Sequence, residues 1–84
     1  MSYRYKRDIL AQLSSHGVQP TAATPPELVH DFVNDLYRYE LRALRDRLLR
    51  REIRKSDYYG HVVRIRQRYP VLALKPWQWV EDRD

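Results

Sequence analysis

The sequence lacks cysteine and has only two glycines among its 84 residues. Without cysteine, the chain can form neither a disulfide nor a zinc–thiolate site, and it has no thiol nucleophile. The glycines, at positions 17 and 60, are too few for a glycine-rich loop that cradles phosphates. These absences exclude the nucleotide-binding loops of the Walker and Rossmann types.

Long apolar runs are also missing, because no stretch approaches the roughly 18–20 apolar residues of a membrane-spanning helix. The start of the chain, residues 1–7, is basic and lacks the apolar core of a secretory signal. We therefore expect no membrane insertion and a cytoplasmic protein.

Side chains that serve in catalysis are present but scattered. His16, His30 and His61 have no histidine three or four positions away, so no predicted helix face presents a pair of metal ligands. Ser14 and Ser15 precede His16, but adjacency on a helix does not give nucleophile–base geometry. The acids form no evident general acid/base pair. We expect a protein that is not an enzyme and that uses no metal and no cofactor.

Apolar residues at intervals of four predict a first helix over residues 3–16. Tyr5, Ile9 and Leu13 share one face of this segment. Gly17 follows directly, and glycine readily adopts the left-handed conformation that ends many helices. The first helix is therefore expected to stop there.

A long second helix is predicted over residues 25–54, a range without glycine or any proline beyond position 26. Thr24, Pro25 and Glu27 have the spacing of a capping box with proline in the first turn. Apolar residues then continue at helical spacing and are expected to face inward: Val29, Phe32, Val33, Leu36, Tyr37, Leu41, Leu44 and Leu48.

A third helix is predicted over residues 56–69, because its apolar residues step by four and three up to Pro70. Residues 63–69 also alternate between apolar and polar, so a strand is the alternative for that part. The following tail, with Trp77 and Trp79, is expected to pack back onto the helices. The predicted fold is a single all-α domain over residues 1–84: a three-helix bundle with one long central helix and an ordered C-terminal segment.

The second helix is too long for a globule of this size. A domain of 84 residues has a radius of gyration of about 12 Å and a diameter of about 30 Å. A helix over residues 25–54 would be about 45 Å long at 1.5 Å per residue. Either the helix breaks without glycine or proline, or one end projects. We expect the basic end, residues 46–55, to project as an arm.

Charge is unevenly distributed along this helix. Residues 17–36 contain three acids and no lysine or arginine, whereas residues 37–55 contain eight bases and three acids. A second copy laid antiparallel would set acidic segments against basic ones, and complementary fields of this kind steer association. The same pattern also suits a solvated helix whose dipole favours acids first and bases last.

Arginine dominates the basic residues of a chain with net charge +5, and its planar guanidinium suits carboxylates, phosphates and aromatic faces. Two tryptophans near the C-terminus could either complete the core or anchor a partner. The candidate partner-binding residues are Arg47, Arg50, Arg51, Arg54, Lys55, Arg64, Arg68, Trp77 and Trp79.

These features predict a non-catalytic protein–protein interaction or assembly module. Its basic arm would hold an acidic protein partner or a second, antiparallel copy in a homodimer. The alternative is a small nucleic-acid-binding protein that relies on arginine, in which Tyr58 and Tyr59 could stack on bases. Asp46, Glu52 and Asp57 interrupt the basic surface and disfavour that alternative.

Overall fold

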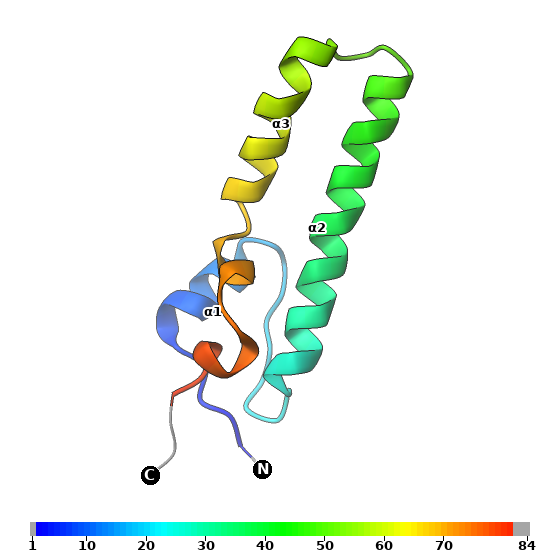
Figure 1. Ribbon diagram of the computed structural model, residues 1–84. Helices are drawn as coiled ribbons and strands as arrows, with labels where there is room; N and C mark the ends of the chain where they lie inside the picture. The colour runs from blue at the N-terminus through cyan, green and yellow to red at the C-terminus, as the bar shows by residue number, and fades with distance from the viewer. Residues whose placement is uncertain (1, 82–84) are drawn as a thin grey trace.

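The computed structural model describes residues 2–81 as three α-helices and two short 3-10 helices. Their bounds are α1 Arg7–Ser14, α2 Pro26–Leu49, α3 Lys55–Gln67, η1 Pro70–Ala73 and η2 Pro76–Trp79. α3 lies antiparallel beside the second half of α2, while α1, η1 and η2 lie beside its first half (Figure 1). This arrangement confirms the all-α fold and the ordered C-terminal segment. Met1 and residues 82–84 of the expected domain lie outside the described residues.

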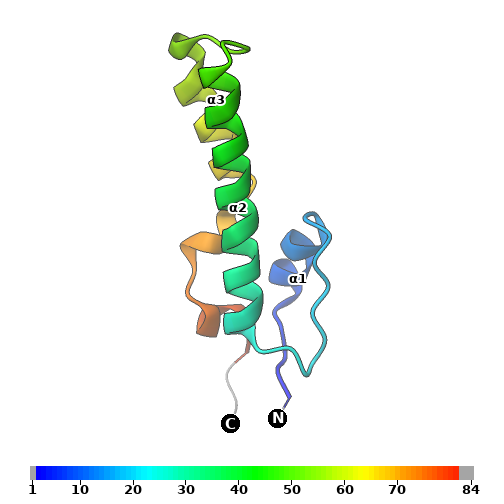
Figure 2. The ribbon, with the colours of Figure 1, turned by 90° about the vertical axis from the view of Figure 1, so that its right-hand side faces the viewer.

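The molecule is elongated, with extents of 53 × 17 × 16 Å and a radius of gyration of 15.4 Å. A compact domain of this length has a radius of gyration of about 12 Å. The difference arises because the second half of α2 and the whole of α3 form a helical hairpin that extends away from the other elements (Figures 1 and 2). We refer to residues 38–67 as the hairpin and to the remaining described residues as the body.

The first helix is shorter than the predicted range 3–16, because residues 3–6 are extended. The Lys6 amide donates to the Trp79 carbonyl at 2.9 Å, and Tyr5 forms an antiparallel bridge with Val80. The Tyr5 hydroxyl donates to the Thr24 carbonyl at 2.6 Å. The N-terminal segment is thus held between the C-terminal segment and the loop before α2.

The end of α1 confirms the expected role of Gly17, which has a φ of +75°. Its amide donates to the Ser14 carbonyl at 2.9 Å, and the Val18 amide donates to the Leu13 carbonyl at 3.0 Å. These two bonds form a Schellman motif, in which a left-handed residue lets the chain satisfy the last helical carbonyls.

The predicted capping box at the start of α2 is wrong. Pro25 is the N-cap residue and Pro26 the first helical residue, without a side-chain cap. The Thr24 hydroxyl instead accepts the amide of Thr21 at 3.0 Å, within a turn closed by the Thr24 amide and the Thr21 carbonyl. A threonine hydroxyl engaged in a local turn of this kind is not available to the helix.

The second helix ends at Leu49 rather than at residue 54, so the expected single-helix arm over residues 46–55 is wrong. The chain reverses over residues 50–54, and α3 then packs back along α2. The reversal needs no glycine, because Arg51 itself adopts the left-handed conformation with a φ of +60°. The molecule is still longer than a compact domain, but its projecting part consists of two paired helices instead of one.

Glu52 stabilises this reversal in place of the usual apolar contact. Its amide donates to the Arg47 carbonyl at 2.9 Å, as in a second Schellman motif. Its carboxylate accepts the Arg50 Nε at 2.5 Å and lies 3.9 Å from the Arg47 Nε.

α3 settles the alternative for residues 63–69 in favour of the helix, which ends at Gln67. One 3-10 turn follows, in which the Tyr69 amide donates to the Arg66 carbonyl at 3.1 Å. Pro70 then prevents the helix from continuing, because proline has no amide to donate.

The core is concentrated in the body. Trp79 is completely buried, and its indole Nε1 donates to the Val71 carbonyl at 3.1 Å. Within the hairpin, only Leu44 and Ile65 are buried. Phe32 was expected to face inward but is 54% exposed. Besides Pro26 at the start of α2, the buried residues are Tyr5, Ile9, Leu13, Val29, Val33, Leu44, Ile65, Tyr69, Val71 and Trp79.

Replacing Trp79 by alanine is expected to lower the free energy of unfolding by about 3–5 kcal/mol, because the substitution leaves a large cavity between α2 and the C-terminal segment. Urea denaturation of the variant measures this loss. Trp77→Ala is the matched control: the side chain of Trp77 is 67% exposed, so a change within about 0.5 kcal/mol is expected. Equal losses for the two variants would contradict this packing.

Replacing Arg51 by glycine is expected to raise the free energy of unfolding by about 0.5–1 kcal/mol, since glycine avoids the steric cost of a left-handed L-residue. Arg54→Gly removes the same charge at a position with a φ of −79°, where glycine relieves no steric cost. That control is expected to stay within about 0.5 kcal/mol of the natural chain, because glycine is also tolerated at a helix N-cap. Chemical denaturation of both variants measures each effect, and destabilisation by Arg51→Gly would be inconsistent with the described turn.

Candidate functional site

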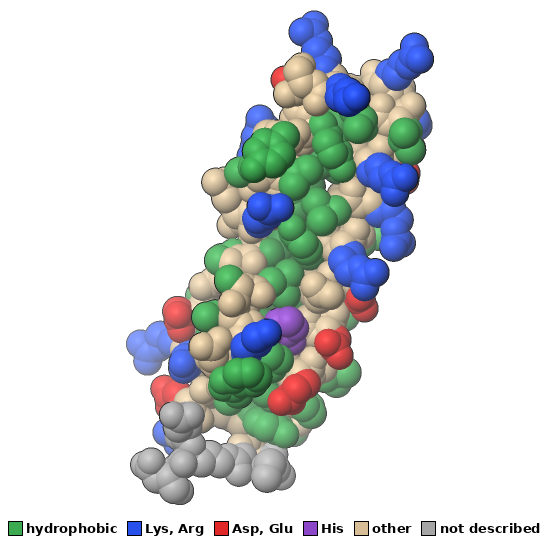
Figure 3. Space-filling view, viewed as in Figure 1, with side chains coloured by type: hydrophobic (Ala, Val, Ile, Leu, Met, Phe, Trp, Pro, Cys, Tyr) green, Lys and Arg blue, Asp and Glu red, His purple; other side chains and the backbone are tan. Residues whose placement is uncertain are grey.

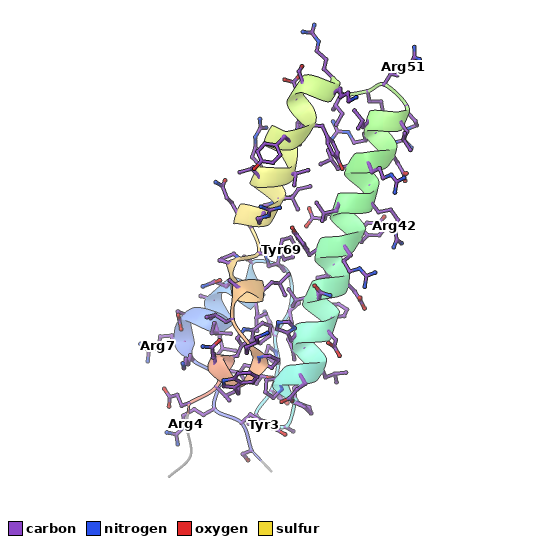
Figure 4. All side chains as sticks on the ribbon, viewed as in Figure 1. Tyr3, Arg4, Arg7, Arg42, Arg51 and Tyr69 are labelled. Carbon is purple, nitrogen blue, oxygen red and sulfur yellow. The ribbon has the colours of Figure 1, made fainter. Side chains whose placement is uncertain are left out.

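The reversal between α2 and α3 brings four of the predicted site residues to the end of the hairpin. Arg50, Arg51, Arg54 and Lys55 are all exposed there. Lysine and arginine side chains gather at this end of the face shown in Figure 3, and Arg51 points away from both helices (Figure 4). We call these four residues the basic tip.

Three further predicted site residues, Arg47, Arg64 and Arg68, meet in a groove between α2 and α3 with a volume of about 640 Å³. Leu44 and Ile65, which are 3% and 8% exposed, form part of its apolar floor. The remaining lining residues are Tyr39, Glu40, Ala43, His61 and Gln67. We call this surface the arginine groove.

The arginine groove and the basic tip adjoin each other, because Glu52 of the reversal lies 3.9 Å from the Arg47 Nε. Arg47 and Arg50 share that one carboxylate, and Arg68 pairs with Glu40 at 2.5 Å.

The four remaining cations of this surface have no ion pair within residues 2–81: Arg51, Arg54, Lys55 and Arg64. The surface therefore carries excess positive charge that the fold itself does not neutralise.

The tryptophans do not join this surface. Trp77 lies in η2, at the end of the molecule opposite the basic tip, and its side chain is 67% exposed (Figure 1). Trp79 is completely buried, so the prediction that it contacts a partner is wrong. Its apolar surface is already buried within the chain and is not available to a partner.

The contribution of Tyr39, Glu40 and His61 to the arginine groove was not predicted from the sequence. The information for His61 was present, since positions 61, 64, 65 and 68 share one face of a helix at spacings of three and four. The residues from α2 required knowledge of which face of α2 meets α3, and the sequence alone does not give that pairing.

A cluster at the base of the hairpin holds α1 against the end of α3. The His16 ring stacks on Tyr69 with centroids 4.1 Å apart, and its Nε2 donates to the Arg68 carbonyl at 2.5 Å. The Tyr69 hydroxyl donates to the Glu40 carboxylate, which also accepts Arg68. Burial, together with this hydrogen bond, raises the pKa of Tyr69 to about 12. His16 therefore contacts another element, rather than only ending its own helix.

Within residues 2–81, no group of three His, Asp or Glu side chains is placed to hold a metal ion. No helix in that range combines the length and the apolar character needed to cross a membrane. No protein-family model matches the chain, and no curated protein and no solved structure shows significant similarity to it.

The raised pKa of Tyr69 predicts a loss of stability at alkaline pH. The unfolded chain releases the phenolic proton near pH 10.0, whereas the folded chain keeps it to about pH 12. The contribution of this group is therefore complete below pH 10 and decreases as the pH rises from 10 toward 12. Tyr69→Phe is expected to make the decrease shallower in urea unfolding measured across this range. Tyr59→Phe, at a side chain that is 70% exposed, should leave it unchanged, and equal pH profiles for both variants would refute the assignment.

Proposed function

We propose that this chain is a non-catalytic interaction module that binds an acidic protein partner along the arginine groove and the basic tip. The observation that carries the proposal is the convergence of Arg47, Arg64 and Arg68 on one groove with an apolar floor. Guanidinium groups bind carboxylates in a planar, bidentate geometry, so these side chains fit a row of Asp and Glu residues.

The shape of the molecule supports the same proposal. The hairpin extends away from the body, so a partner can approach the groove and the tip without contact with α1 or the C-terminal segment (Figure 2). Four cations of this surface have no ion pair within the described part of the chain. A partner carboxylate would therefore gain a pairing without displacing an existing one.

The apolar floor of the groove favours a protein over a nucleic acid as the partner. Leu44 and Ile65 can accept apolar side chains of an amphipathic peptide, whereas a phosphate backbone offers none. Exposed acids at Asp46, Glu52 and Asp57 lie among the bases and would repel the evenly spaced charges of a phosphate backbone, whereas a peptide can place neutral residues opposite them. Tyr59, which is 70% exposed beside the basic tip, is the feature that supports the nucleic-acid alternative, through stacking on bases.

Binding of a fluorescent peptide of alternating Glu and Leu residues tests the proposal by anisotropy. Replacing Arg51, Arg54 and Arg64 by glutamine is expected to weaken binding on the order of 100-fold, because each lost charge pairing costs roughly 1 kcal/mol. The melting temperature should change little, since these side chains are exposed.

The matched control replaces Lys6, Arg7 and Lys75 by glutamine, which removes the same charge from the body. It should retain peptide binding, and equal weakening in both triple variants would contradict the proposed site. Single-stranded RNA in place of the peptide tests the alternative. Tighter binding of RNA, with a log–log salt slope steeper than about −3, would favour nucleic acid instead.

A further inference from the structure

The outward face of α2 has no neighbour within the described part of the chain. In Figure 2 this helix lies in front of the other elements along its whole length, and no segment crosses it. Arg42, on this face, points away from α3 (Figure 4). The face is distinct from the arginine groove, which lies between α2 and α3.

Six charged residues form a single stripe on this face, and the stripe changes sign at its centre. They recur at spacings of three and four, which places them on one side of the helix. All six are exposed, and none has an ion pair within residues 2–81. In chain order they are Glu27, Asp31 and Asp35, followed by Arg38, Arg42 and Arg45.

Such a stripe is complementary to itself when reversed, and we propose that a second copy of this chain binds it antiparallel. A two-fold axis between Leu36 and Tyr37 sets Asp31 opposite Arg42 of the second copy and Asp35 opposite Arg38. Symmetry doubles these contacts to four ion pairs, as in any isologous interface. A parallel arrangement would instead oppose like charges along the whole stripe.

Apolar side chains flank the stripe on one side and fit the same register. Leu28, Phe32 and Tyr39 are 62%, 54% and 69% exposed. With the axis at the same place, Phe32 lies two residues, or about 3 Å of helix rise, from Tyr39 of the second copy. The two rings would cover each other, which accounts for an exposed phenylalanine at a position that sequence analysis assigned to the core.

The charge pattern selects a second copy over an unrelated partner. A uniformly acidic or basic partner would meet like charges over half of the stripe, whereas a reversed copy meets opposite charges at its four central positions. This interface shares Tyr39 with the arginine groove but none of its charged residues, and it shares no residue with the basic tip. It therefore goes beyond the proposed function and is tested separately from it.

A charge-swap experiment tests the interface. One full-length variant carries Asp31→Arg and Asp35→Arg, which makes its stripe entirely basic apart from Glu27. The other carries Arg38→Asp and Arg42→Asp, which makes its stripe acidic apart from Arg45. Sedimentation equilibrium measures association of the natural chain, of each variant alone and of the two variants mixed.

The natural chain is expected to reach twice its mass of 10.3 kDa with increasing concentration. Each variant alone should self-associate on the order of 100-fold more weakly, because like charges then face each other. The mixture should form a heterodimer, since all four ion pairs return, two with their natural sign and two with reversed sign. Circular dichroism of each variant separates loss of association from loss of folding.

Arg51→Asp with Arg54→Asp is the matched control, since it introduces the same charge change at the basic tip. This control should dimerise like the natural chain but no longer bind the acidic peptide. Its behaviour therefore distinguishes the dimer interface from the proposed peptide-binding surface. A natural chain that stays at 10.3 kDa at every concentration would overturn the inference. So would variants that dimerise alone, or a mixture that does not.

Discussion

The length of α2 is the constraint on which the rest of the structure depends. Its 24 residues span about 36 Å, which is more than the diameter of a compact domain of this size. The body covers only the first half of the helix, so the second half needs another partner. α3 supplies it by packing back from the reversal at residues 50–54. The arginine groove and the basic tip both result from this pairing of α2 with α3.

The two halves of α2 are stabilised unequally. Around the first half, segments distant in sequence converge: the extended residues 3–6, the end of α1 and the C-terminal segment with Trp79. Along the second half, the buried contacts reduce to the seam that contains Leu44 and Ile65. Because this seam is narrow, the long side chains on both sides of it stay exposed. These side chains give the hairpin its charged surface.

Sequence patterns predicted those features of the fold that are governed by local physics. The end of α1 before Gly17 needs only a residue tolerant of a positive φ, and the helical state of residues 63–67 follows from the lack of a partner strand. Features that depend on which of several neighbouring groups a residue bonds to, or on which residue adopts a strained conformation, were not predicted. Thr24 bonds to its own turn rather than to α2, and Arg51 ends that helix without the glycine that usually marks such a site.

The candidate site was predictable only in part, for the same reason. Arg64 and Arg68 were candidates from their charge and are four residues apart, but their meeting with Arg47 required the antiparallel pairing of two helices. The two tryptophans could not be told apart in the sequence. Only tertiary packing places Trp79 between α2 and η1 and leaves Trp77 exposed.

Small-angle scattering of the full chain, at dilutions where it is monomeric, tests the central claim most directly. An extended hairpin predicts a radius of gyration no smaller than 15.4 Å and a longest dimension of at least 53 Å. A radius of gyration of about 12 Å, as for a compact domain of this length, would show that α2 and α3 fold back onto the body and would contradict the account.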